Sequence, residues 1–144
     1  MKRNAIFLAL VLAAALAMPA AAQPAGDVAP CNDSGGGGLC LNGNRFHVTV
    51  SWRIPSSGAQ GTGTPIPMSA DTGAFWFFQP SNYEIAVKVL DGRGLNSHFW
   101  VFFASLTDVE FDLTVTDTTT GQQRTYHNSA GTLASRSDTE AFPQ

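Results

Sequence analysis

Phe75-Trp76-Phe77-Phe78 and Phe99-Trp100-Val101-Phe102-Phe103 are two aromatic blocks that decide the fold of this chain. Between them, Tyr83-Glu84-Ile85-Ala86-Val87-Lys88-Val89-Leu90 has the period of a β-strand. Successive side chains of a strand point to opposite faces, so a strand that is apolar at every position is expected to be covered on both faces. These segments therefore predict a packed β domain whose central sheet is buried on both sides.

Further strands are predicted on either side of this centre. Residues 46–53 alternate apolar and polar side chains, which indicates a half-buried strand with Trp52 in the core. Residues 109–116 alternate in the same way, with acidic residues and threonines facing water. We expect 122–127 to be an edge strand, and 64–68 to be a short edge segment because its prolines cannot donate to a ladder.

Turns separate these strands. Residues 55–64 are rich in Gly, Pro and Ser and predict a long loop, and Asp91–Ser97 predicts a turn because Gly and Asn tolerate positive φ. In the last part of the chain, 129–144 shows little pattern, although we expect Phe142 to dock onto the sheet. Beyond residue 22 no stretch has convincing helical spacing.

Short strands joined by turns build an antiparallel sandwich or a small barrel. We predict an all-β fold over residues 39–144, a single antiparallel β-sandwich with about six or seven strands and an Ig-like size. The Cys…Trp…Cys spacing of true Ig domains is missing.

The N-terminus has the pattern of a secretory signal. A short basic segment precedes the apolar run 5–17, and small residues follow, so 1–22 is predicted to be a signal peptide cleaved after Ala22. The apolar run is shorter than the roughly 20 residues that a membrane span needs, so we expect no membrane anchor after cleavage. We therefore predict a secreted or periplasmic protein, with 23–38 as a flexible linker rich in Gly and Pro.

The chain has two cysteines, Cys31 and Cys40, and cysteines of an exported protein usually pair. They bracket a glycine-rich loop that is flexible enough to close a bond, so a structural disulfide is predicted. A Cys-x-x-Cys redox motif is missing.

The charge of the chain argues against two classes of partner. Its formal net charge is −3, and the basic residues that follow residue 22 are scattered singly. Because nucleic acids and anionic membranes are bound by dense positive patches, we expect neither as a partner.

A series of motifs carries a resemblance to a known family. The matching segments are Leu39–Phe46, Val48–Trp52, Asp71–Asn82, Glu84, Val87–Gly92, Asn96, Phe99–Phe102, Leu106–Glu110 and Leu113–Thr118. Together they resemble a family of uncharacterised secreted bacterial β-rich domains, over about Leu39–Asn128. The resemblance implies export and a β-rich domain and attaches no activity. Relatives often carry a cysteine where this chain has Arg93, which leaves Cys31–Cys40 as the only disulfide.

The sequence predicts no catalysis and no cofactor. It has no Gly-x-Ser-x-Gly elbow and no lone catalytic cysteine. The spacing of His47, His98 and His127 does not force them together as a metal site. Asp91–Asn96 faintly resembles a calcium loop but lacks the EF-hand pattern, so we interpret it as a turn.

We therefore expect a secreted, non-catalytic interaction module. Its partner would be an extracellular or envelope protein, or a polysaccharide. Trp76 and Trp100 are candidate contact residues because Trp is enriched at binding hot spots, and Asp91, Arg93 and Asn96 are candidates in an exposed loop. Two alternatives are an inhibitor of a secreted peptidase that presents a loop, and a carbohydrate-binding module that stacks Trp76 or Trp100 on sugar rings.

Overall fold

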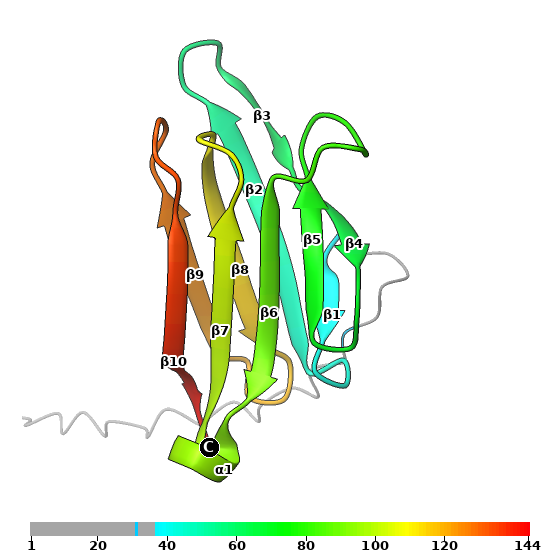
Figure 1. The fold of residues 1–144 in the computed structure, drawn as a ribbon, viewed down its shortest axis with the longest axis vertical. Coiled ribbons are helices and arrows are strands. Elements are labelled where there is room, and N and C mark those ends of the chain that lie inside the picture. Colours follow the sequence, from blue (N-terminus) through cyan, green and yellow to red (C-terminus); the bar gives the residue numbers. More distant parts are fainter. Residues whose placement is uncertain (1–30, 32–36) are drawn as a thin grey trace, which may run out of the picture.

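The computed structural model describes Cys31 and residues 37–144. They form two antiparallel sheets that pack face to face as a β-sandwich, as Figure 1 shows. This confirms the predicted all-β sandwich. The predicted signal peptide lies outside the described residues, as does most of the predicted linker.

Sheet A has the strand order β1-β2-β8-β9, and β3 also pairs with β2. Its strands are β1 (Leu39–Leu41), β2 (Phe46–Ile54), β3 (Ala59–Thr62), β8 (Glu110–Asp117) and β9 (Gln123–Asn128). Sheet B has the order β10-β7-β6-β5-β4. Its strands are β4 (Thr64–Pro67), β5 (Thr72–Trp76), β6 (Ile85–Asp91), β7 (His98–Ser105) and β10 (Ser135–Pro143).

The hydrophobic core lies between the two sheets, as strand alternation predicts. One face of each long strand is buried, and the large side chains with essentially no exposed surface include Phe46, Phe75, Phe99, Phe111, Phe142, Ile85 and Leu113. The expected inner faces of 46–53 and 109–116 are confirmed. Trp52 is an exception, since it is only partly buried and packs at the margin of the core beside Phe77.

The structure has more strands than the predicted six or seven, because short edge strands carry little hydrophobic signal. Residues 55–64 are not one long loop: β3 pairs with the exposed edge of β2 although its sequence, Ala-Gln-Gly-Thr, shows no alternation. The expected edge segment at 64–68 is confirmed as β4. The tail forms β10, where the burial of Ala141 and Phe142 and the pairing with β7 outweigh a mostly polar sequence.

A one-turn helix, α1 (Arg93–Asn96), connects β6 to β7 and lies at the same end of the sandwich as the C-terminus (Figure 1). The predicted turn there is thus helical. Ser97 ends it in the left-handed region, at φ 62°. In the described part of the chain, no helix has the length and hydrophobicity to span a membrane.

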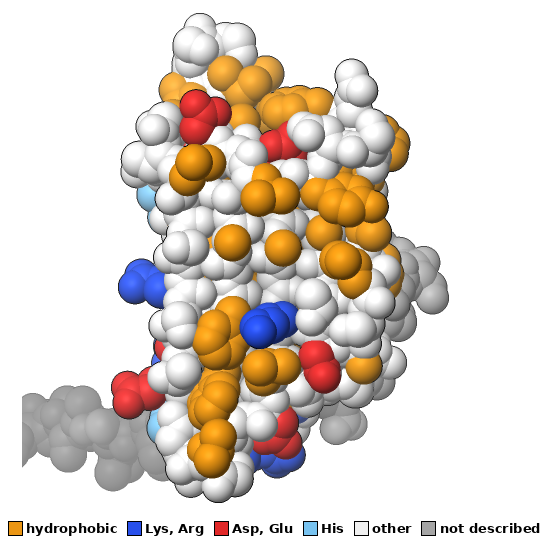
Figure 2. Space-filling view, in the orientation of Figure 1, with side chains coloured by type: hydrophobic (Ala, Val, Ile, Leu, Met, Phe, Trp, Pro, Cys, Tyr) orange, Lys and Arg blue, Asp and Glu red, His pale blue; other side chains and the backbone are white. Residues whose placement is uncertain are grey.

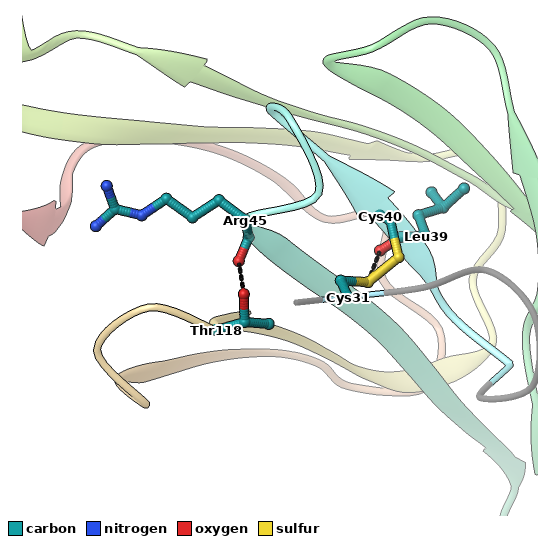
Figure 3. Close-up of a disulfide and its surroundings, with 5 residues drawn as sticks. All are labelled: Cys31, Leu39, Cys40, Arg45 and Thr118. Atoms are coloured by element: carbon teal, nitrogen blue, oxygen red, sulfur yellow. Dashed lines mark hydrogen bonds between the residues drawn. A yellow bond between two sulfur atoms is a disulfide. The ribbon is translucent and has the colours of Figure 1, made fainter. Parts of the chain in front are cut away.

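The predicted disulfide joins Cys31 to Cys40 of β1, as Figure 3 shows. Cys31 falls within the predicted linker, yet it is buried and its N–H donates to the carbonyl oxygen of Asn44 at 3.2 Å. The bond therefore ties the chain before β1 to the edge of sheet A.

Replacing both Cys31 and Cys40 by serine is expected to lower the free energy of unfolding by about 2–3 kcal/mol, because the open loop regains entropy in the unfolded chain. Urea unfolding of the two proteins measures this difference. Dithiothreitol is a matched control, since the chain has no other cysteine: it should destabilise the wild type and leave the variant unchanged. Equal unfolding midpoints for the oxidised wild type and the variant would contradict this role.

Candidate functional site

The outer face of sheet A, which points away from the core, is polar throughout β2, β3, β8 and β9. This is the usual state of an antiparallel sheet that meets solvent on one side. The outward side chains on these strands are His47, Thr49, Ser51, Arg53, Gln60, Thr62, Glu110, Asp112, Thr114, Thr116, Gln123, Thr125 and His127.

The outer face of sheet B has the opposite character. Register and alternation place a group of apolar side chains on it: Ile66, Ala74, Trp76, Ala86, Leu90, Trp100, Phe102 and Ala104. We call this group the apolar face. Figure 2 shows it, with hydrophobic side chains at lower left and upper right and a basic side chain between them. Thr64, Thr72 and Lys88 lie on the same outer face, between its aromatic residues. Exposed aromatic residues gathered on one face are typical of interaction sites on soluble proteins.

The prediction that the central sheet is covered on both sides is therefore wrong. In both aromatic blocks one set of residues packs in the core, and the intervening residues Trp76, Trp100 and Phe102 stay partly exposed. The physical reason is that the described residues form only two layers, so nothing among them packs on the outside of sheet B.

Trp100 is held rigidly on β7. Its indole Nε1 donates to Oδ1 of Asn96 at 2.8 Å, and Nδ2 of Asn96 donates to the carbonyl oxygen of Thr139 at 2.7 Å. The indole also lies against Gly92, where a Cβ would come within 2.1 Å of the ring. Glycine therefore allows the indole to lie directly against the backbone, since a side chain at this position would have to displace the ring.

Asp91 and Arg93 form a bidentate ion pair, with Nε to Oδ1 at 2.9 Å and Nη2 to Oδ2 at 2.7 Å, and the Arg93 guanidinium lies over the ring of Phe99. The hydrogen bonds from the Arg93 side chain and backbone lower the pKa of Asp91 to about 2. Both side chains are exposed, and each largely neutralises the other. The structure thus joins these four candidate residues in two separate pairs, Asp91 with Arg93 and Asn96 with Trp100, at the end of the sandwich that carries α1.

Trp76 lies far from these residues. Trp76 is the last residue of β5 and lies one position beyond the pair Phe75–Ile85. Trp100 pairs with Leu90, near the other end of β6. Six residues of strand separate the two levels, which is about 20 Å. The two candidate tryptophans therefore mark opposite ends of the apolar face and cannot contact one small ligand together.

A shallow depression of about 310 Å³ lies between the two tryptophans. Its lining is Thr72, Ala86, Val87, Lys88, Phe102, Phe103, Ala104 and Arg136. Lys88 is the basic side chain that the register places on this outer face, since Lys88 pairs with the outward Phe102 and Arg136 pairs with the core-facing Phe103. Sequence reasoning missed these residues. One signal was available, because Ala86, Lys88 and Leu90 alternate with buried residues and so had to share the outer face of β6.

A larger depression of about 650 Å³ lies on the polar face of sheet A. Arg53 pairs there with Glu110, and Nδ1 of His127 lies 2.8 Å from a carboxylate oxygen of Asp112. Ser51, Asp112 and His127 lie in this order across β2, β8 and β9, so the carboxylate is in the middle. A serine hydrolase has its histidine between the serine and the carboxylate, so this arrangement is different. Among residues 37–144 and Cys31, no group of three or more His, Cys, Asp or Glu residues could hold a metal ion.

Four large hydrophobic side chains are exposed on the loops at the end of the sandwich opposite α1 (Figure 1): Phe78, Tyr83, Leu106 and Leu133. Backbone hydrogen bonds connect these loops, for example the bond from Leu106 N–H to the carbonyl oxygen of Glu84 at 2.7 Å. They lie outside the apolar face and provide exposed apolar positions for comparison with it.

Comparison with protein-family models, with curated proteins and with solved structures gave no match.

Proposed function

We propose that this protein is an exported, non-catalytic binding module that takes its ligand on the apolar face of sheet B. The contrast between the two outer faces carries the proposal. Both sheets expose an outer face, yet sheet A covers its face with polar side chains and sheet B with aromatic residues and alanines. Exposed apolar surface favours association, so this face is suited to a partner.

The geometry of Trp100 supports the same function. Aromatic anchors contribute most when they are held in place before binding, because less side-chain entropy is lost on association. Asn96 and Gly92 already hold the indole of Trp100. Export is supported by the N-terminal signal pattern and by the disulfide, since disulfides persist mainly outside the cytosol.

Affinity capture with the immobilised protein tests the proposal. Secreted and envelope fractions of the source organism are passed over wild type, Trp100→Ala and Phe102→Ala, and retained protein and polysaccharide are quantified. Retention is expected to fall about tenfold or more in each variant, because each removes an aromatic contact of the apolar face.

Two further variants serve as controls. Thr114→Ala changes the polar face of sheet A, and Leu133→Ala removes an exposed apolar side chain outside the apolar face. Both should retain ligand as the wild type does, and thermal unfolding should show that every variant is folded. Loss of retention in Thr114→Ala, with Phe102→Ala unaffected, would place the site on sheet A and overturn the proposal.

A further inference from the structure

The indole of Trp100 lies flat on the end of sheet B and turns one face away from the protein. A Cβ on Gly92 would lie closest to Cε2, Nε1 and Cδ2 of this indole, at 2.1, 2.2 and 2.7 Å. Such a point lies over the face of the ring, because a point beyond the ring edge would be nearer to Cζ2 than to Cδ2. The backbone of Gly92 therefore covers one face of the indole. Trp100 is still partly exposed, so the opposite face is the one that a ligand can reach.

Phe102 stands upright beside this indole. Its ring centre lies 6.3 Å from that of Trp100, and the two ring planes are inclined by 76°. The indole N–H donates to Asn96, so it needs no further partner. The faces of aromatic rings carry partial negative charge and attract weakly positive C–H groups. The exposed indole face, bounded on one side by Phe102, is therefore suited to the flat C–H face of a sugar ring.

Short polar side chains lie beside these aromatic residues on the same outer face. One row across β5, β6, β7 and β10 consists of Thr72, Lys88, Phe102 and Ser137. Ala86 and Ala104 pair in the next row and line the shallow depression between the two tryptophans. Hydroxyl and ammonium groups at such positions can exchange hydrogen bonds with sugar hydroxyls. Lys88 is the single charged side chain of the row, so the row has no cluster of charge that would select an ionic ligand.

The shape of the face indicates a linear ligand. The apolar face runs about 20 Å from Trp76 to Trp100 along the strands and about 15 Å across four strands, which is an area of about 300 Å². A stable protein interface buries about 800 Å² on each partner, so this face is small for a protein or for a second copy of the chain.

An extended peptide also fits poorly. Peptides that bind to sheets pair with the free backbone groups of an edge strand. The apolar face is centred on β5, β6 and β7, each of which is already paired on both sides. Sugar rings need no backbone partners, because their hydroxyl groups bond to side chains and to water.

On these grounds, and resting on the proposed binding function, we infer that the ligand is a neutral, linear polysaccharide of β-linked pyranose rings with equatorial hydroxyl groups. One ring stacks on the exposed face of Trp100 beside Phe102, and the chain continues along the strands towards Trp76. Equatorial hydroxyl groups leave C–H groups on the ring face that meets the indole, whereas an axial hydroxyl group would press a polar atom against it.

Native affinity electrophoresis tests this inference. Hydroxyethyl cellulose and glycol chitin, cast in the gel, are the neutral β-linked probes. Pullulan is a neutral α-linked polymer, and polygalacturonate is an acidic one. At least one of the two β-linked polymers is expected to retard the wild type, and pullulan and polygalacturonate are not.

Trp100→Phe and Trp100→Leu are the matched variants. Both remove the N–H donor to Asn96 and both keep an apolar side chain, but only phenylalanine presents a flat aromatic face. Trp100→Leu is expected to weaken binding of the β-linked polymer about tenfold, and Trp100→Phe is expected to weaken it clearly less. Leu133→Ala, outside the apolar face, should be retarded as the wild type is.

Equal binding by Trp100→Phe and Trp100→Leu would overturn the inference, because the face would then act only as apolar surface. No retardation of the wild type by either β-linked polymer, or equal retardation by pullulan or polygalacturonate, would also overturn it. In each of these cases, affinity capture that still depends on Phe102 would leave the proposed binding function standing with a ligand of another class. No dependence on Phe102 in either assay would overturn both.

Discussion

Replacing Phe142 by alanine is expected to lower the midpoint of thermal unfolding by about 12 °C or more. The side chain has no exposed surface, and its ring centre lies 5.2 Å from that of Phe46, which lies 4.9 Å from that of Phe99. Removing a buried Phe costs about 3–5 kcal/mol, and 1 kcal/mol shifts the midpoint of a domain this size by about 4 °C or more.

The loss of stability is large because the burial of Phe142 holds the edge strand β10 in place. β10 is an edge strand, and its pairing with β7 shifts register between Asp138 and Phe142. The backbone hydrogen bonds are irregular there, so the burial of Phe142 is expected to hold the end of β10 against β7. Thermal unfolding followed by far-ultraviolet circular dichroism measures the shift. Leu133→Ala is the control, because Leu133 lies two residues before β10 and is 71 % exposed. Equal midpoints for the two variants would show that β10 does not depend on this anchor.

Replacing Asp117 by alanine is expected to cost about 3–5 kcal/mol, because it leaves the Arg45 guanidinium unpaired in a mostly buried site. Arg45 donates to both carboxylate oxygens, at 2.9 and 2.7 Å, and Asp117 also accepts from the backbone N–H of Thr119 and the hydroxyl of Thr120. The Asp117 side chain is 1 % exposed. Urea unfolding measures the loss. Asp91→Ala breaks an exposed pair of the same kind and should change the midpoint little.

The lowered pKa of Asp117 also predicts how the free energy of unfolding depends on pH. Burial acts to raise the pKa of Asp117, but the hydrogen bonds from Arg45, Thr119 and Thr120 outweigh it and lower the pKa. Because folding lowers this pKa, ionised Asp117 stabilises the protein at pH values above its unfolded pKa of about 4. This contribution to the unfolding free energy is lost as the pH falls through the pKa of the folded state. The unfolding free energy should therefore fall as the pH drops below about 4, and the fall should be smaller in Asp117→Asn. Parallel curves for the two proteins would contradict this assignment.

The long strands could be predicted from the sequence because one face of each packs in the core and the other does not. Alternation is then visible in the residues themselves, as in the buried Val48 and Val50 on either side of the outward Thr49. β3 and β10 could not be predicted in this way. Their residues are mostly exposed, and they form because the edges of β2 and β7 offer free backbone groups.

The candidate site was predictable only in part. Trp76 and Trp100 stand out by residue type, and alternation separates Trp100 and Phe102 from the buried face of β7. The depression beside Lys88 was not predictable, because its lining comes from β5, β6, β7 and β10, and the sequence does not give the order of these strands in the sheet. The ion pair of Asp91 with Arg93 depends on the one-turn helix α1, for which the sequence has no periodic signal.

The most direct test of the binding face is to map contacts on the wild-type protein. Amide ¹H–¹⁵N chemical shifts are recorded while the solubilised envelope fraction retained by the protein is added. Binding to the apolar face should shift amides of β5, β6 and β7, led by residues 72–76, 86–90 and 98–104, and should leave β2, β8 and β9 unchanged. Shifts confined to β2, β8 and β9, or to the loops that carry Leu106 and Leu133, would show that the ligand binds elsewhere.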